Sequence, residues 1–189
     1  MTLDTAAIIA ETRAWVDRAV IGLNLCPFAK AVQVKGQIRY VVCPASEPAE
    51  LLITLCDELH RLAESDPQDV DTTLLIHPAA LTDFLDFNDF LAVADAAVEE
   101  HGYAGILQVA SFHPQFQFAD THINDVSNAT NRAPFPTLHL LRESSIDRAV
   151  AAFPEAETIF EANIETLENL GAEGWAALQA QCKRDAENR

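Results

Sequence analysis

The segment LTDFLDFNDFLAVADAAVEEHGYAGILQVASFHP (residues 81–114) joins two patterns of hydrophobic spacing, and their order decides the fold. In the first part, large apolar residues recur at helical spacing, which predicts a helix with Thr82 or Asp83 as N-cap and Gly102 as its stop. The second part, residues 104–114, is a nearly continuous apolar run, which predicts a buried strand near the centre of a sheet. A helix followed by a buried strand is typical of α/β proteins.

The same alternation extends outward over the chain. We predict one α/β domain over residues 1–189, a sandwich whose mixed, partly parallel sheet of four or five strands is flanked by helices and followed by a helical C-terminal region. The fifth strand would be AVQV (31–34), paired in a hairpin. The first expected element is a helix at residues 5–23. The α/β body of residues 32–143 should contain a helix from about 48 to 63 and strands at 37–44, 71–78, 104–114 and 136–143. C-terminal helices should follow over residues 145–187, with Ser144 or Ser145 as a cap, Pro154 at the start of a helix and Gly171 at its end.

The charge balance of the 189-residue chain argues against several classes of partner. Its 29 acidic residues outnumber 12 lysines and arginines, which gives a net charge of -17. Nucleic acids and anionic membranes bind clusters of basic side chains, and this sequence has none. No apolar run approaches the roughly 20 residues that cross a bilayer, and the N-terminal stretch lacks the basic region of a secretory signal. We therefore expect a cytoplasmic protein that binds neither nucleic acids nor membranes.

Three of the expected strands end in the same way, as YVVCP, LLIHP and SFHP. Cys43, His77 and His113 therefore each stand directly before the proline that ends a strand. If these strands are parallel, all three residues lie at the carboxyl edge of the sheet, where open α/β proteins bind ligands. One cysteine and two histidines suit zinc or iron, although proline also ends strands without any functional reason.

A further cysteine, Cys26, lies in the segment NLCPFAK. It follows the first helix rather than beginning one, so we expect no helix N-terminus to lower the pKa of its thiol. Its two interpretations are a buried structural thiol and a nucleophile. None of the four cysteines has C-x-x-C spacing, and free thiols are expected in the cytoplasm.

Residues 114–135 form the longest stretch without a regular pattern, and they are rich in Asn, Asp, Thr and Ser. Structureless loops of about 20 residues are uncommon in compact domains and are usually functional or disordered. Pro134 and Pro136 stiffen the return into the next strand, which fixes Asn131 and Arg132 relative to it. The planar fork of Arg132 suits a carboxylate or phosphate, so we expect it to bind an anionic ligand.

The strand expected at residues 136–143 carries a histidine and an arginine of opposite orientation. Because side chains alternate along a strand, His139 points into one layer, and Arg142 points away from it or lies near an end. The structural alternatives are a hydrogen-bonded core histidine for His139, and for Arg142 an ion pair with Glu143 or with an acid on a helix.

Four segments have long and unusual sequences: NLCPFAK (24–30), LQVASFHPQFQF (107–118), NRAPFPTLHLLRESSIDRAV (131–150) and LGAEGW (170–175). They closely resemble the bacterial DUF1415 family, a domain of unknown function, and the resemblance covers nearly the whole chain. It implies kinship without a reaction, and it favours Cys26 over Cys43 as a ligand or nucleophile. It places the motif of the family on Asn24, Cys26, Pro27, His113, Pro114, Asn131, Arg132, His139, Arg142 and Glu143.

Our leading hypothesis is a small enzyme or ligand-binding protein that acts on an anionic small molecule at the sheet edge, under residues 114–135. His113 would serve as general base or metal ligand with His139 as its partner, and Asp120 or Glu143 would orient a histidine. The residues expected to bind the substrate are Asn131, Arg132, Arg142 and His77.

Three variants of this hypothesis stay open. A metal-assisted site would hold zinc or iron on His113, His139 and one of Cys26, Asp120 or Glu143. A non-enzymatic accessory protein would use the polar loop as a docking surface. A thiol redox protein would use Cys26, with Cys43 or Cys56 approaching it in space. Convergence of His113, Arg132 and His139 in one pocket would favour an enzyme or ligand-binding protein over the accessory role.

Overall fold

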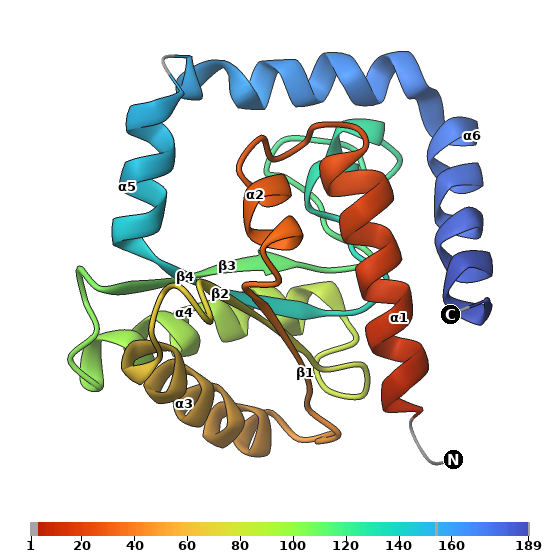
Figure 1. Cartoon of the computed structure of the whole chain (residues 1–189). Coiled ribbons are helices and arrows are strands. Elements are labelled where there is room, and N and C mark those ends of the chain that lie inside the picture. Colours follow the sequence, from red (N-terminus) through yellow and green to blue (C-terminus); the bar gives the residue numbers. More distant parts are fainter. Residues whose placement is uncertain (1–3, 154, 189) are drawn as a thin grey trace.

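Four strands form one mixed sheet in this computed structural model, which describes residues 4–153 and 155–188 (Figure 1). The strands lie in the order β1-β2-β4-β3. β1 and β2 are parallel, and β4 is antiparallel to both β2 and β3, so that β1, β2 and β3 all run in the same direction. The α/β class and the partly parallel sheet were predicted correctly. The strands are β1 (Ile38–Val42), β2 (Thr72–Ile76), β3 (Leu107–Phe112) and β4 (Thr137–Arg142).

The prediction that the strand at residues 104–114 is central was wrong, because β3 lies at an edge of the sheet. β4 takes the inner position and pairs with β2 and β3 along its whole length. An edge strand has a continuous run of apolar residues in its sequence when both of its faces are covered. Val109 packs against the core beneath one face of the sheet, and Phe112 meets Trp15 on the other.

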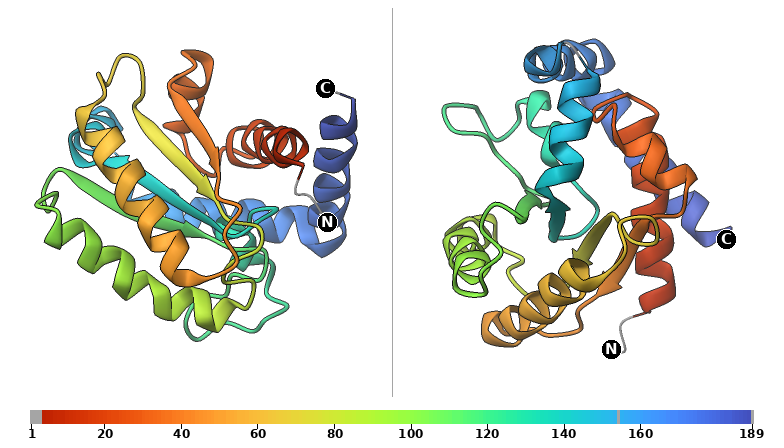
Figure 2. Two further views of the ribbon diagram at one scale, coloured as in Figure 1. Left: turned by 90° about the horizontal axis from the view of Figure 1, so that it is seen from below. Right: turned by 60° about the vertical axis from the view of Figure 1, so that its left-hand side comes forward.

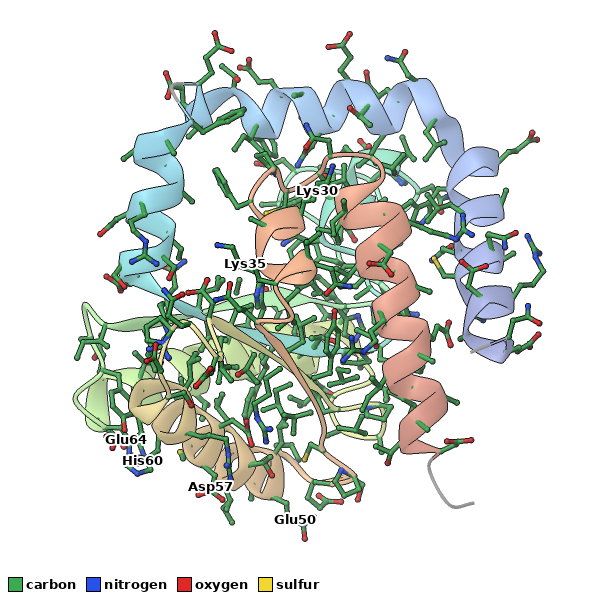
Figure 3. All side chains as sticks on the ribbon, viewed as in Figure 1. Lys30, Lys35, Glu50, Asp57, His60 and Glu64 are labelled. Atoms are coloured by element: carbon green, nitrogen blue, oxygen red, sulfur yellow. The ribbon has the colours of Figure 1, made fainter. Side chains whose placement is uncertain are left out.

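Two helices cover the first face of the sheet, α3 (Pro48–Glu64) and α4 (Phe84–Glu100) (Figure 2). α4 begins as predicted, since the Asp83 carboxylate accepts the backbone N–H groups of Leu85 and Asp86. It ends before Gly102, whose φ of 76° suits glycine. Figure 3 shows three acidic side chains of α3, Glu50, Asp57 and Glu64, on its outer side, consistent with a solvated face; Glu58 of the same helix is buried and pairs with Arg39.

The second face of the sheet is covered by the N-terminal helix, α1 (Thr5–Trp15), which continues as a π-helix over Val16–Ile21. The segment AVQV, predicted as a strand, instead lies in the short helix α2 (Ala29–Val34). Its Gln33 donates to the Asp17 carboxylate and accepts from the Tyr40 hydroxyl, so contacts with the π-helix and β1 hold it as a helix. Alternation over four residues is too short to exclude this. Cys26 therefore does precede a helix, contrary to our expectation.

The C-terminal region continues directly from β4 through α5 (Glu143–Ala152), η3 (Ala156–Thr158) and α6 (Ile159–Glu187). α5 begins at Glu143, so neither Ser144 nor Ser145 caps it; Pro154 lies outside the described residues. Gly171 ends the first half of α6 as predicted, with φ 71° and ψ 170°. The chain then turns, and the second half runs beside α1 (Figure 1), where Arg18 pairs with Asp185.

The kink at Gly171 generates a testable prediction. Its backbone angles lie in a region that only glycine adopts readily, so Gly171→Ala should lower the free energy of unfolding by about 1–3 kcal/mol. Chemical denaturation would measure this loss. The matched control is Gly36→Ala, which also has φ 71° but lies in an exposed turn. A Gly171→Ala loss no larger than that of the control would show that the kink is not rigidly held.

Candidate functional site

The three residues that precede strand-ending prolines lie at one edge and on one face of the sheet. Because β1, β2 and β3 run in the same direction, Cys43, His77 and His113 all follow their carboxyl ends. His77 and His113 both contact the ring of Phe87 on α4, with centroid distances of 5.7 and 5.1 Å. Both histidines are fully buried. The structure thus brings this predicted group together, but beneath α4 and away from solvent.

His113, the expected general base, has both ring nitrogens engaged. Nδ1 accepts the backbone N–H of Gln115 at 3.0 Å, so Nε2 carries the proton and donates to the carbonyl of Leu81 at 3.3 Å. Burial lowers the pKa of His113, which favours the neutral ring. A ring that donates at one nitrogen and accepts at the other holds the loop after β3 and has no free nitrogen for a substrate.

His77 has one ring nitrogen without a partner. Nδ1 donates to the carbonyl of Ala80 at 3.0 Å, which leaves Nε2 as a buried acceptor that lacks a hydrogen bond within the described residues. Burial lowers the pKa of His77 to about 4, so the ring is neutral near pH 7. A buried neutral ring stacked on Phe87 acts as part of the core, and no cavity described below reaches it.

His139 lies on the opposite face of the sheet from His77 and His113. Its Nε2 is 2.7 Å from the hydroxyl of Thr72, and its ring contacts Phe112. Burial lowers the pKa of His139 to about 4. Because the sheet separates His139 from His113, the two do not form the metal pair that we had considered. No group of three or more Cys, His, Asp or Glu side chains among residues 4–153 and 155–188 is placed to hold a metal ion.

Arg142 and Glu143 lie at the other end of β4 from the polar loop. The six residues of β4, Thr137–Arg142, span about 20 Å in a strand, so neither side chain shares a site with His113. The Arg142 guanidinium donates to the carbonyls of Leu62, Ser65 and Val70, where it caps the C-terminus of α3. Arg142 is thus buried, committed to the backbone through Nε and one terminal nitrogen, and absent from the lining of both cavities described below.

The loop of residues 114–135 is ordered by one buried amide. The side chain of Asn128 accepts from the Phe118 N–H and the Thr121 hydroxyl, each at 2.9 Å, and it donates to the His122 carbonyl at 2.9 Å. The segment Val126–Asn131 forms a 3-10 helix, where we had expected no regular structure. Asp120 is exposed at a φ of 64° and does not hydrogen-bond to His77, His113 or His139. The organising role of Asn128 was not predicted.

Arg132 is held at the end of this loop by two backbone carbonyls. Nε donates to Phe116 at 3.0 Å, and one terminal nitrogen donates to Ile123 at 2.7 Å. The guanidinium forms no ion pair with a carboxylate of the described residues, and burial lowers its pKa, although Asp125 opposes this. Asn131 has a structural role, since its amide donates to the Ser111 carbonyl at 3.1 Å. Arg132 is therefore a fixed, partly buried cation without a direct counter-ion.

A cavity of about 460 Å³, here called the helix cavity, lies between α1, the second half of α6 and residues 132–135. Trp15 and Trp175 form its apolar walls. Its charged lining consists of Arg132, Lys183 and Glu11, which gives one net positive charge. Burial raises the pKa of Glu11, and the Lys183 ammonium nearby opposes this. Ligand pockets are commonly about 300–1,000 Å³, so the helix cavity suits a small molecule.

A second cavity of about 320 Å³, here called the sheet pocket, lies between the sheet, α1, α2 and α5. Its walls are mainly apolar, but they include His139 and Cys26. Burial raises the pKa of the Cys26 thiol, while the backbone N–H groups of Phe28 and Ala29 oppose this. The structure therefore brings together two of the predicted catalytic residues, Cys26 and His139, on the opposite face from His113.

Several lining residues were not predicted as functional. Trp15 contributes to both cavities, and Trp175, Lys183 and Glu11 line the helix cavity. Trp15 is itself buried, with an exposed fraction of 4%. The pairing of α1 with the end of α6 spans more than 160 residues, and no local pattern reveals it.

The buried histidines generate a prediction for acid stability. Below about pH 6.5 the unfolded chain binds a proton at His77 that the folded chain does not bind until about pH 4, so stability falls as pH falls. Each such histidine changes the free energy of unfolding by about 1.4 kcal/mol per pH unit in that window. His77→Gln should reduce the slope by this amount between about pH 6.5 and pH 5, measured by urea unfolding. The control His122→Gln removes an exposed histidine, and an equal loss of slope there would contradict the assignment.

Comparison with known proteins places these features in one family. No curated protein and no solved structure matches the chain. No helix among the described residues has the length and apolar character needed to cross a membrane. Residues 7–177 match the model of a family described as "Protein of unknown function (DUF1415)". This match covers the sheet, the sheet pocket and α6 as far as residue 177, whereas the helix-cavity residues Leu178, Gln179, Ala180, Cys182 and Lys183 lie beyond it; the chain belongs to the DUF1415 family.

Proposed function

We propose that this protein binds an anionic small molecule in the helix cavity, with Arg132 as the principal recognition group. The observation that carries the proposal is the state of Arg132, a guanidinium fixed by two carbonyls and not paired with a carboxylate. A partly buried charge without a counter-ion is costly, and an anionic ligand would remove that cost. Because the guanidinium is already positioned, little side-chain entropy is lost on binding.

The remaining charges of the cavity support the same sign of ligand. Lys183 adds a second cation from α6, and Glu11 opposes it from α1. The net charge of the chain is -17, so long-range forces repel an anion. At about 0.15 M salt the Debye length is about 8 Å. Salt therefore screens the repulsion between the ligand and distant acidic side chains, but not its attraction to Arg132, which it would contact directly.

The arrangement favours binding over acid–base catalysis. The helix cavity contains Cys182, but burial raises the pKa of this thiol to about 11, so it is protonated near neutral pH. His113 is engaged at both nitrogens and does not reach the cavity. The role of ligand binding therefore has stronger support than the enzyme role of our leading hypothesis, and the proposed location is the cytoplasm, in agreement with four free thiols.

The two other hypotheses have less support. For a docking role of the loop, the relevant observation is that Ile123 is 47% exposed and Phe160, which contacts Phe118, is 55% exposed. For a redox role of Cys26, the expected partners Cys43 and Cys56 pack on the other face of the sheet. A disulfide with Cys26 would require the sheet to open.

The two tryptophans of the chain provide a direct test, because both line the helix cavity. Titration with inorganic phosphate, succinate and citrate should shift both indole N–H signals saturably in ¹H–¹⁵N NMR spectra, with Trp175→Phe assigning each signal. The absence of a saturable shift with all three probes would overturn the proposal.

Charge variants that leave the loop intact sharpen this test. Lys183→Gln should weaken the affinity for the bound anion by about two- to tenfold, and Glu11→Gln should strengthen it by a similar factor, as expected for one charge at partly screened distance. Arg132→Gln should weaken binding more than either. The control is Arg148→Gln on α5, which is exposed and outside the cavity. A change in the same direction for Lys183→Gln and Glu11→Gln would contradict an electrostatic role.

A further inference from the structure

The sheet pocket differs from the helix cavity in its charge. No lysine or arginine lines it, and its one charged residue is Asp71. The Asp71 carboxylate already accepts from the hydroxyl of Ser145 at 2.6 Å, and Arg148 lies 4.0 Å away. Lys30 of α2 and Lys35, which follows this helix, are exposed (Figure 3) and do not line the pocket. The pocket therefore offers no cation to an anionic ligand.

His139 presents a hydrogen-bond acceptor in this pocket. The Thr72 hydroxyl lies 2.7 Å from the carbonyl of Leu140, which can only accept, so the single hydroxyl proton is donated there. The oxygen of Thr72 must then accept from Nε2 of His139, which fixes the proton on Nε2 and leaves a lone pair on Nδ1.

Nδ1 of His139 is both unpartnered and accessible. It has no hydrogen-bond partner among the described residues. The fully enclosed polar atoms that lack a partner in that part of the chain are Thr73 Oγ1 and His77 Nε2, so Nδ1 retains accessible surface. The sheet pocket is the cavity that the His139 ring lines. Since burial keeps the ring neutral at pH 7, Nδ1 remains an acceptor there.

Most of the remaining wall is apolar, although Gln108 and Ser145 also line it. Trp15, Val20 and Phe28 cover it from the helical side, and Ile146 and Ala149 cover it from α5. A volume of about 320 Å³ lies at the small end of the range for ligand pockets, about 300–1,000 Å³. Burial of an apolar body gives affinity in such a site, and one polar group gives orientation.

We propose that the sheet pocket is a second binding site, which takes a neutral, mainly apolar molecule that ends in a hydroxyl or N–H group donating to His139 Nδ1. This ligand class differs from the anion proposed for the helix cavity. A carboxylate of the same length lacks a donor for Nδ1, and Asp71 repels it.

Cys26 provides a reporter for this site. Cys43 and Cys182 are buried, so Cys56→Ser leaves Cys26 as the accessible thiol. In that variant, n-octanol should slow the reaction of Cys26 with N-ethylmaleimide saturably, by about fivefold or more, whereas octanoate at equal concentration should have little effect. Protection by octanoate equal to or stronger than that by octanol would overturn the assignment of the ligand class. The absence of protection by octanol would overturn the site.

Two further variants distinguish the contribution of the hydrogen bond to binding from the contribution of the pocket volume. His139→Phe keeps a flat ring and removes the acceptor, so it should weaken protection by octanol about two- to tenfold, the range of one neutral hydrogen bond. Ala149→Leu narrows the pocket from α5 without altering His139, and it should abolish protection even if His139→Phe does not fold. Octanol protection that survives Ala149→Leu unchanged would place the ligand elsewhere and contradict the proposal.

Discussion

The pairing of β4 with both β2 and β3 is the constraint on which the rest of the structure depends. Its hydrogen bonds fix the register, and the alternation of its side chains then assigns each residue to one of two cores. Leu138 and Leu140 face α3 and α4, whereas His139 faces the layer of α1. A shift of one residue in the register of β4 would exchange these faces. It would also bury Arg142 in a place that lacks carbonyl groups to accept its hydrogen bonds. Both cavities lie on the α1 side of the sheet, and the other side holds the larger core cluster beneath α3 and α4.

The sequence was sufficient for the local elements and for their class. Proline at the start of α3, the Asp83 cap of α4 and the stop at Gly171 depend on neighbours a few residues away, and these predictions were confirmed. Strand order depends on which strands share hydrogen bonds, and hydrophobicity alone does not encode this. An apolar run such as residues 107–112 fits an edge strand covered on both faces as well as a central one. For the same reason, the helix at AVQV became clear only through its contacts with Asp17 and Tyr40.

The candidate site was predicted in part. The common edge of His77 and His113 and the placement of Arg132 at the end of the loop follow from chain direction and from the prolines. The proposed convergence of His113 with His139 failed because residues on neighbouring strands can face opposite layers, and strand order was needed to decide this. Lys183 and Glu11 were not predicted because they meet only after α6 turns back along α1. His77 and His113 are instead fully buried and unavailable to a ligand.

Trp15 has a consequence that neither cavity suggests alone, since its side chain belongs to the walls of both. Molecules in the two cavities would both contact this side chain, whose ring packs edge-on against Phe112. Any adjustment of that ring by one occupant alters the shape offered to the other. Thermodynamic linkage then makes the effect reciprocal. If the first molecule changes the affinity for the second by some factor, the second changes the affinity for the first by the same factor. A single side chain that fills the space between the cavities can thus make two chemically unlike ligands dependent on each other.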